Sequence, residues 1–488
     1  MSCLQNKEMR NPILRLALPS IVTNITVPLL GIVDLAIVGH IPTLDADGLS
    51  SCWEAAPSSA AVIGAVAVGS LIFNMVYWLF NFLRMGSSGL TAQAYGRGDG
   101  QSQRRILRMA LTVALGCGLL IFALQRPIEW MARWIIDPSA EVWDLSIAYF
   151  RIRIWAAPAV LALFAMNGWL VGMQNSRYPM YIAIGQNLIN ILVSYLLVFH
   201  AGMGIEGVAL GTVVSQYVGL LAAFYLCKRQ SPKAKLSTEL STNPVDNADL
   251  HTYQRQNVDK NGANAESYQH PDVHIEWKTF FTVNRDIFFR MICLIAVTTA
   301  FTAYGARMGD TLLAVNTLLM QLFTLFSYFC DGFALAGEAL TGKAIGRKES
   351  TNRLVHQLFL WGWGITLPFT LIYLFGGSML LRIFTDDTFV LTSALPYLPW
   401  AAAIPVCGFA AFLWDGIFVG ATRTREMFLS LFFGAILFFA LYEGGCRLLP
   451  AIAPGVSPNH LLWISFLLYL LLRGFVLWLF WRKRKGSY

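Results

Sequence analysis

Long apolar segments, each about the length needed to cross a lipid bilayer, recur along the whole chain. A membrane-spanning helix requires about 20 predominantly apolar residues. Of the 488 residues, 56% are hydrophobic and only 13% are charged. Because lipid offers no hydrogen-bond partner to the backbone, segments of this kind form helices when they cross a membrane. The sequence therefore predicts an all-α polytopic membrane protein.

Twelve spans are predicted from the apolar segments and the breakers between them. They cover residues 12–38, 58–83, 106–124, 146–173, 178–199, 205–227, 284–307, 311–336, 354–375, 391–420, 427–446 and 460–481. The eight cysteines are scattered without a CxxC pair, so we expect neither a disulfide framework nor a bound metal. No cleavable signal peptide is predicted.

Basic residues are distributed unevenly between the two sides of these spans. With the N-terminus inside, eighteen lysines and arginines fall in the inner termini and short loops, and four fall outside: Arg126, Arg133, Arg382 and Arg447. Cytoplasmic loops of membrane proteins are enriched in these residues. We therefore expect a multi-pass protein of the inner (plasma) membrane with both termini in the cytoplasm. The net charge of +8 is attributed to these loops, and no nucleic-acid partner is expected.

A polar stretch separates the spans into two groups of six. Residues 228–282 are rich in Asn, Gln, Ser and His and contain few apolar residues. This composition is typical of a flexible linker, here a cytoplasmic one. The predicted organisation is an N-terminal lobe (1–227), a hydrophilic linker (228–282) and a C-terminal lobe (283–488).

The two groups of spans contain matching motifs. The segment GLTAQAYGR at Gly89–Arg97 resembles ALTGKAIGR at Ala339–Arg347, at an offset of 250 residues. The segment WLVGMQNSR at Trp169–Arg177 resembles IFVGATRTR at Ile417–Arg425, at an offset of 248 residues. Each half holds an even number of spans, so a pseudo-two-fold axis along the membrane normal should relate them. Parallel repeats of this kind are typical of secondary transporters.

These and other segments resemble the multidrug and toxic compound extrusion (MATE) family, and more closely its DinF branch. In chain order the similarity is carried by LALPS at 16–20, NITVPLLG with the following Val-Asp at 24–34, GLTAQA at 89–94, NRDI with Arg290, DGFA with Glu338, and DGIFVGATR with the Glu-Met at 426–427. The order and spacing of the motifs carry the resemblance, and the linker reads as an insertion.

The resemblance implies two six-helix lobes around a V-shaped cleft that opens to alternate sides. It also implies export of organic, often cationic or amphipathic, compounds against an inward flux of H⁺ or Na⁺. No cofactor other than the coupling ion and no enzymatic activity are expected. Small-molecule substrates and membrane lipid are the expected partners of a functional monomer.

Asp34 is a single carboxylate inside the first predicted span. An ionisable residue within a membrane helix is costly, and by default it marks a functional site. Burial favours the neutral form of a carboxyl group, so such a residue can load and release a proton. Pro28 lies six residues earlier and removes one helical hydrogen bond, which allows the helix to bend there. We predict that Asp34 is the proton site and Pro28 its hinge.

The family resemblance places neighbours around Asp34. Asn190 and Thr212 match positions on the fifth and sixth helices that could hydrogen-bond the acid or ligate an ion, and Asn187 lies three residues before Asn190. Many relatives carry a second aspartate where this chain has Ser194. A cage with one carboxylate favours proton coupling through Asp34 over tight Na⁺ binding.

The second half carries four further candidates in or near its spans. Asp331 and Glu338 are seven residues apart and share a helix face. They either have a structural role, as partners of Arg290 or in a polar network at the cytoplasmic edge, or take part in transport, and the sequence favours neither reading. Asp415 lies well inside the tenth predicted span and is expected to have a structural role.

Two other classes of function compete with ion-coupled export. A lipid-linked or envelope-precursor flippase of the same superfamily would need a basic cavity, and Arg290 is the residue of this chain that could contribute to one. A membrane enzyme or scaffold is not favoured, because the sequence has neither an HExxH motif nor a nucleophile–base constellation.

Overall fold

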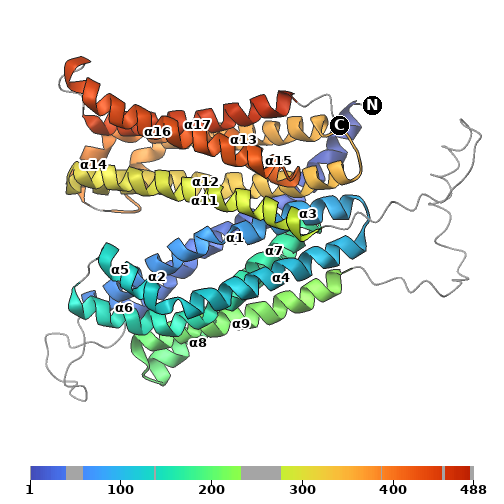
Figure 1. The fold of residues 1–488 in the computed structure, drawn as a ribbon. Helices are drawn as coiled ribbons and strands as arrows, with labels where there is room; N and C mark the ends of the chain where they lie inside the picture. Colours follow the sequence, from blue (N-terminus) through green and yellow to red (C-terminus); the bar gives the residue numbers. More distant parts are fainter. Residues whose placement is uncertain are drawn as a thin grey trace, which may run out of the picture.

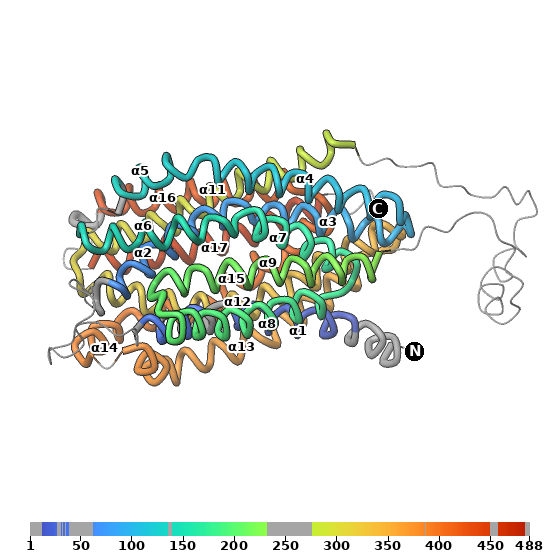
Figure 2. The backbone as a smooth tube through the Cα atoms, turned by 90° about the horizontal axis from the view of Figure 1, so that it is seen from below, coloured from blue at the N-terminus to red at the C-terminus, as the bar shows by residue number. Residues whose placement is uncertain are grey.

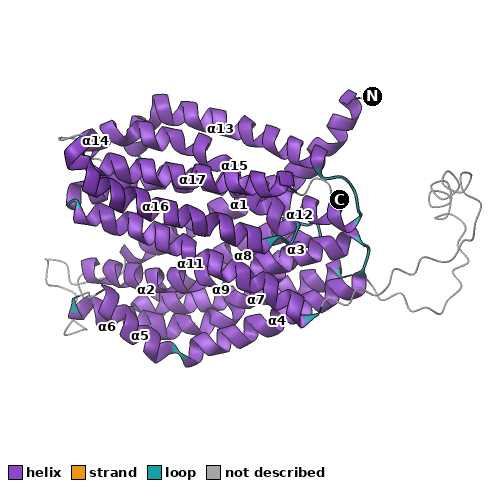
Figure 3. Cartoon of the chain, turned by 45° about the horizontal axis from the view of Figure 1, so that its top comes forward, coloured by secondary structure: helices purple, strands orange, loops and turns teal. Residues whose placement is uncertain are grey.

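The computed structural model describes residues 2–39, 59–136, 139–231, 276–385, 387–452 and 457–483. These residues are almost entirely helical and include no strand (Figure 3). From Val62 onward, eleven helical stretches of the described chain are long and apolar enough to cross a membrane. The helix that precedes them, α1, packs beside α8 and α12 within the bundle (Figure 2). The predicted all-α fold is confirmed.

The first bundle contains the helices up to the linker. They are α1 (Ser2–Gly39), α2 (Ser59–Leu79), α3 (Phe82–Gly96), α4 (Gly100–Ala123), α5 (Gln125–Ile136), α6 (Ala140–Arg153), η1 (Ile154–Ala156), α7 (Ala157–Gly172), α8 (Arg177–Tyr195), η2 (Leu196–His200) and α9 (Gly204–Gln230). A turn joins α2 to α3, and η1 joins α6 to α7, so each pair forms one long span.

The second bundle follows the linker. It contains α11 (Trp277–Arg307), α12 (Asp310–Gly346), α13 (Asn352–Leu381), α14 (Thr388–Ala394), η3 (Leu395–Tyr397), α15 (Leu398–Gly420), α16 (Thr424–Ile452) and α17 (Pro458–Lys483). The two bundles lie side by side in Figure 1, and we call them the N-lobe and the C-lobe.

Two helices run further than the apolar pattern predicts. The spans predicted at 58–83 and 311–336 continue to Gly96 and Gly346, so the repeated motifs lie within helices. The extension of α3 contains Ser87, Ser88 and Thr91, which look like loop residues in the sequence. All three are fully buried, at 0% exposure, because the end of α3 packs between other helices. Tertiary packing, and not hydropathy, therefore sets these helix ends.

The sequence also missed some structure outside the predicted spans. Helix α5 was expected to be loop. The predicted linker, 228–282, lies largely outside the described residues, but its described edges belong to helices, because α9 continues to Gln230 and α11 begins at Trp277.

The lobes meet at the end of the molecule that carries both termini, which we call the terminal end (Figure 1). There α3 crosses α12 at a pair of glycines. A Cβ atom on Gly96 would meet the carbonyl oxygen of Lys343, and a Cβ atom on Gly346 would meet that of Gln93. The two glycines are related by the same offset of 250 residues as the sequence repeat. Such a reciprocal contact is expected where a pseudo-two-fold axis passes between two helices.

Two glutamines bind across the same seam. The side-chain nitrogen of Gln93 donates to the carbonyl oxygen of Gly420 at 3.0 Å and to the hydroxyl of Thr422 at 3.1 Å. The side-chain nitrogen of Gln174 donates to the carbonyl oxygen of Ala339 at 2.7 Å. Backbone contact and hydrogen bonds together close the lobes against each other at the terminal end.

We expect glycine packing inside the C-lobe to be intolerant of even one methyl group. A Cβ atom on Gly416 of α15 would collide with the carbonyl oxygen of Ala334 of α12, whereas one on Gly364 of α13 would meet nothing within 4 Å. Overpacking a helix contact costs about 1–3 kcal/mol. Gly416→Ala should therefore lower the thermal unfolding midpoint in detergent.

The matched control is Gly364→Ala, which removes a glycine from a helix interior and should be neutral or slightly stabilising. Equal midpoints for the two variants would contradict the close approach of α12 and α15.

Candidate functional site

Asp34 lies on α1, five residues before the end of this helix at Gly39. Its carboxyl Oδ1 atom is buried and has no hydrogen-bond partner among the protein groups. The neighbouring residue Val33 packs against an apolar cluster from α2, α6 and α9, which includes Val62 and Val208. The sequence therefore folds one carboxyl group into a largely apolar part of this lobe.

The predicted neighbours of Asp34 form a polar layer between α8 and α9. Asn190 is fully buried, and its side-chain nitrogen donates to the Thr212 hydroxyl at 3.0 Å. The Thr212 hydroxyl in turn donates to the carbonyl oxygen of Val208 at 3.1 Å. The Ser194 hydroxyl faces Gly211 on α9. The structure thus joins Asn190 to Thr212, and neither side chain donates to Asp34 in this conformation.

Two asparagines tie α1 to both lobes just before Pro28. The side-chain nitrogen of Asn187 on α8 donates to the carbonyl oxygen of Thr26 at 3.0 Å. The side-chain nitrogen of Asn24 donates to the carbonyl oxygen of Tyr328 on α12 at 3.1 Å. The backbone of α1 is helical through Pro28, whose side chain lies outside the described part of the structure. The terminal half of α1 is therefore anchored on the N-lobe and on the C-lobe, immediately before the predicted hinge.

Arg153 is a site residue that the sequence analysis did not single out. Its positive charge acts on the Asp34 carboxyl group from α6. The guanidinium is held by hydrogen bonds from Nη1 to the hydroxyls of Ser70 at 3.0 Å and Tyr149 at 2.6 Å. It also lies over the ring of Phe73, 5.1 Å from the centroid. The spacing of Arg151 and Arg153 could have identified it. Residues two apart on a helix lie on nearly opposite faces, so these two arginines could not both lie on the outer face.

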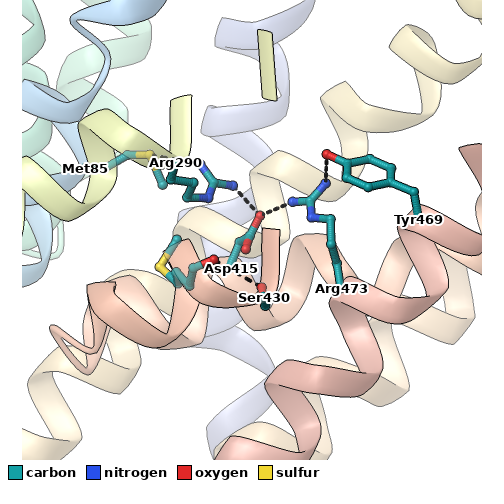
Figure 4. Close-up of polar contacts among 7 residues, drawn as sticks. Met85, Arg290, Asp415, Ser430, Tyr469 and Arg473 are labelled. Carbon is teal, nitrogen blue, oxygen red and sulfur yellow. Dashed lines mark hydrogen bonds and ion pairs between the residues drawn. The ribbon is translucent and has the colours of Figure 1, made fainter. Parts of the chain in front are cut away.

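The C-lobe holds a buried cluster of three charges. Arg290 of α11 and Arg473 of α17 both donate to Oδ2 of Asp415 on α15, the latter at 2.7 Å (Figure 4). Arg473 also donates to the hydroxyl of Tyr469 at 3.3 Å. The three charged residues are only 4–7% exposed. Taking charges out of water costs several kcal/mol each, which the mutual attraction must offset.

Asp331 and Glu338 on α12 lie between this cluster and the N-lobe. The charges of Arg84, Arg290 and Arg473 act on Asp331, and that of Arg84 also acts on Glu338. Arg84 belongs to α3, so an N-lobe cation faces two C-lobe acids across the seam. Glu338 is 2% exposed, and its Oε1 has no hydrogen-bond partner among the protein groups. Both acids therefore face arginines, but neither forms an ion pair with Arg290.

The two lobes differ in what they can do chemically. In the C-lobe each of Arg290 and Arg473 already binds a carboxylate. In the N-lobe Asp34 has one free carboxyl oxygen and a cation, Arg153, whose own hydrogen bonds go elsewhere. Among the described residues, no group of three or more His, Cys, Asp or Glu side chains could hold a metal ion.

Removing the acid of the C-lobe cluster should destabilise the protein. Asp415→Asn leaves two buried guanidinium groups without an anion, and breaking a buried ion pair from one side costs about 3–5 kcal/mol. We expect a clearly lower unfolding midpoint in detergent. Asp310→Asn, at an exposed acid in the first turn of α12, is the control and should leave the midpoint nearly unchanged. A midpoint for Asp415→Asn equal to that of the control would show that the cluster does not stabilise the fold.

Two helical lobes of repeated sequence that meet at one end form an architecture typical of membrane transporters. The sequence model of the MatE family matches residues 55–196 and 287–442. DNA damage-inducible protein F of Escherichia coli K12 is 34% identical over 477 residues, which cover 97% of this chain and 92% of that protein. The chain therefore belongs to the MatE family, and the resemblance identified from its motifs is confirmed.

Solved structures show the same fold. A structure described as MATE in the bent conformation matches with a TM-score of 0.76 at 17% identity, over 98% of this chain and 95% of that one. The outward-facing conformation of a multidrug resistance MATE family transporter matches with a TM-score of 0.76 at 18% identity, over 98% and 96%. Because the family consists of transporters, the chain is a membrane transport protein.

Proposed function

We propose that this protein is an H⁺-coupled antiporter that exports organic, often cationic or amphipathic, compounds by alternating access. Membership of the MatE family supports the export role. The choice of H⁺ rests on one observation: the partly buried Asp34 carboxyl group has an Oδ1 atom without a hydrogen-bond partner among the protein groups. A proton can bind there without displacing an existing contact.

Protonation of Asp34 would change the charge that faces Arg153. The ionised carboxylate balances the guanidinium, whereas the neutral acid does not. The half of α1 beyond Pro28, which packs on α2, α6 and α9, would then be held less strongly in its present position. The other half would stay in place because Asn24 and Asn187 hold it to both lobes. The proposed outcome is a bend at Pro28 that reduces the substrate space in the N-lobe.

The proposal includes the arrangement of the chain in the membrane. Residues 1–227 and 283–488 form the two lobes of a functional monomer, and residues 228–282 link them in the cytoplasm. The terminal end, where the lobes are closed against each other, faces the cytoplasm of the inner (plasma) membrane. In this arrangement the described conformation is closed toward the cytoplasm. Apart from the coupling ion, no cofactor is required.

The alternative function, a lipid-linked or envelope-precursor flippase, receives less support. Arg290 was the residue that a phosphate group could have used, but its side chain is only 7% exposed and its guanidinium binds Asp415, so it does not offer an accessible cation. Flipping of a fluorescent lipid in proteoliposomes, measured beside dye efflux, distinguishes the two functions.

Replacing Asp34 should uncouple transport from the proton gradient. The experiment reconstitutes the full chain in proteoliposomes and follows ethidium transport with pH and Na⁺ gradients imposed separately. The unmodified protein should respond to the pH gradient alone. Asp34→Asn should lose most of the gradient-driven rate, because an amide cannot take up and release the coupling proton.

Asp144→Asn is the matched control, because Asp144 is an exposed acid of the same lobe. It should transport at the unmodified rate. Concentrative transport by Asp34→Asn would contradict the role of Asp34, and transport driven only by Na⁺ would contradict proton coupling.

A further inference from the structure

Helix α5 presents an apolar and basic face at the end of the N-lobe away from the termini (Figure 1). Trp130 and Trp134 are 74% and 79% exposed, and Met131 beside them is half exposed. Arg126 and Arg133 lie along one flank of the same face, at helical spacing from Trp130. A helix with exposed tryptophans and flanking arginines is typical of the membrane–water interface. Helix α5 therefore has the composition expected of a helix at the membrane–water interface.

The buried side of α5 is fixed by an ion pair. Glu129 is 8% exposed and accepts from Arg151 of α6 through both carboxylate oxygens, at 2.9 Å and 3.0 Å. Arg126 approaches the same carboxylate at 3.4 Å. Two arginines thus share one carboxylate, and their side chains remain 72% and 48% exposed. Arg126, Arg151 and Glu129 together carry a net charge of +1.

An apolar crevice of about 490 Å³ begins at Arg151. Its other lining residues are Ile152, Trp155, Leu210, Val213 and Tyr217. The crevice lies between α6 and α9 on the outer surface of the N-lobe, where Trp155 and Tyr217 are 58% and 41% exposed. A hydrogen bond from the Tyr217 hydroxyl to the carbonyl oxygen of Trp155, at 2.9 Å, joins the two walls. The crevice is thus lined by largely apolar side chains and one arginine, Arg151, which shares the Glu129 carboxylate with Arg126.

We propose that this crevice binds one phospholipid, with its phosphate at Arg126 and Arg151 and an acyl chain against Trp155, Leu210 and Val213. Arginine binds phosphate through charge-assisted hydrogen bonds. The exposed acids Glu141 and Asp144 lie on α6 beyond Arg151, toward its start. These carboxylates would repel a phosphate group, so the phosphate site is limited to the part of the surface that carries Arg126 and Arg151.

The crevice is lined mainly by α6 and α9, the two helices that also carry Arg153 and Thr212 of the proposed coupling site. Leu210 and Val213 line the crevice, while Thr212 between them is buried and binds Asn190. Likewise Ile152 lines the crevice, while the adjacent Arg153 acts on Asp34. A bound lipid therefore contacts α6 and α9 from outside and stabilises the arrangement that holds Arg153 and Thr212. This consequence for transport rests on the proposed function, whereas the binding itself does not.

Native mass spectrometry of the full chain in mild detergent tests the binding. The probes are dioleoylphosphatidylglycerol and dioleoylglycerol, which share acyl chains and differ in the phosphate headgroup. We expect one retained phosphatidylglycerol per chain and at least about tenfold weaker retention of dioleoylglycerol, the loss expected for charge-assisted hydrogen bonds. Arg126→Gln should lower phosphatidylglycerol retention toward that of dioleoylglycerol, and Arg151→Lys, which keeps the charge near Glu129, should lower it less than Arg151→Gln.

A second variant leaves every arginine in place. Leu210→Trp fills the crevice, so it should reduce retention of both lipids. The control is Arg382→Gln, at an exposed arginine of the C-lobe, which should bind like the unmodified chain. Equal retention of the two lipids, or unchanged phosphatidylglycerol retention in both Arg126→Gln and Leu210→Trp, would overturn the proposal. Retained lipid binding in a chain that does not transport ethidium would refute the proposed function and leave the lipid site standing.

Discussion

Direct backbone contact between helices is the interaction on which this architecture depends. In a bilayer, burying one apolar side chain against another gains little, because lipid is as apolar as the side chains, so close approach through small residues matters more. Gly168 lies against the carbonyl oxygen of Arg84 in the N-lobe, and Gly416 lies against that of Ala334 in the C-lobe. The pair Gly96 and Gly346 makes the equivalent contact between lobes. The buried charges are held where they are by these contacts.

Repetition of the backbone does not extend to the charges. The C-lobe surrounds Asp415 with two arginines, so its charge is compensated by short contacts in the described conformation. The N-lobe keeps Asp34 apart from Asn190 and Thr212 and opposite one arginine that is bound elsewhere. The C-lobe thus has one carboxylate bound by two arginines, whereas no arginine of the described residues forms an ion pair with Asp34. The C-lobe also contains Glu338, whose Oε1 lacks a hydrogen-bond partner as Oδ1 of Asp34 does, so each lobe has an acid of this kind.

The sequence was sufficient for the fold and for part of the site. Length and hydropathy predict the spans because every segment that crosses the lipid has to be apolar, helical and about 20 residues long. Periodicity could not predict the end of α3, where Ser87, Ser88 and Thr91 are buried because α3 packs between helices of both lobes. The cluster around Asp415 needs residues from α11, α15 and α17, which are distant in the chain and meet only through packing. Arg153 escaped notice because a basic residue at a span edge is usually an interfacial anchor.

The contact between Gly96 and Gly346 shows how closely the two repeats match at the axis between them. In a symmetric dimer of two identical lobes, the same residue would occupy both equivalent positions beside the axis and would have to fit both. In a fused tandem repeat, each side can change alone. Gln93 donates across the seam, whereas its counterpart Lys343 lies with its ammonium 5.9 Å from the ring centroid of Tyr95. The two repeats therefore make the same backbone contact at the axis but use different side chains beside it.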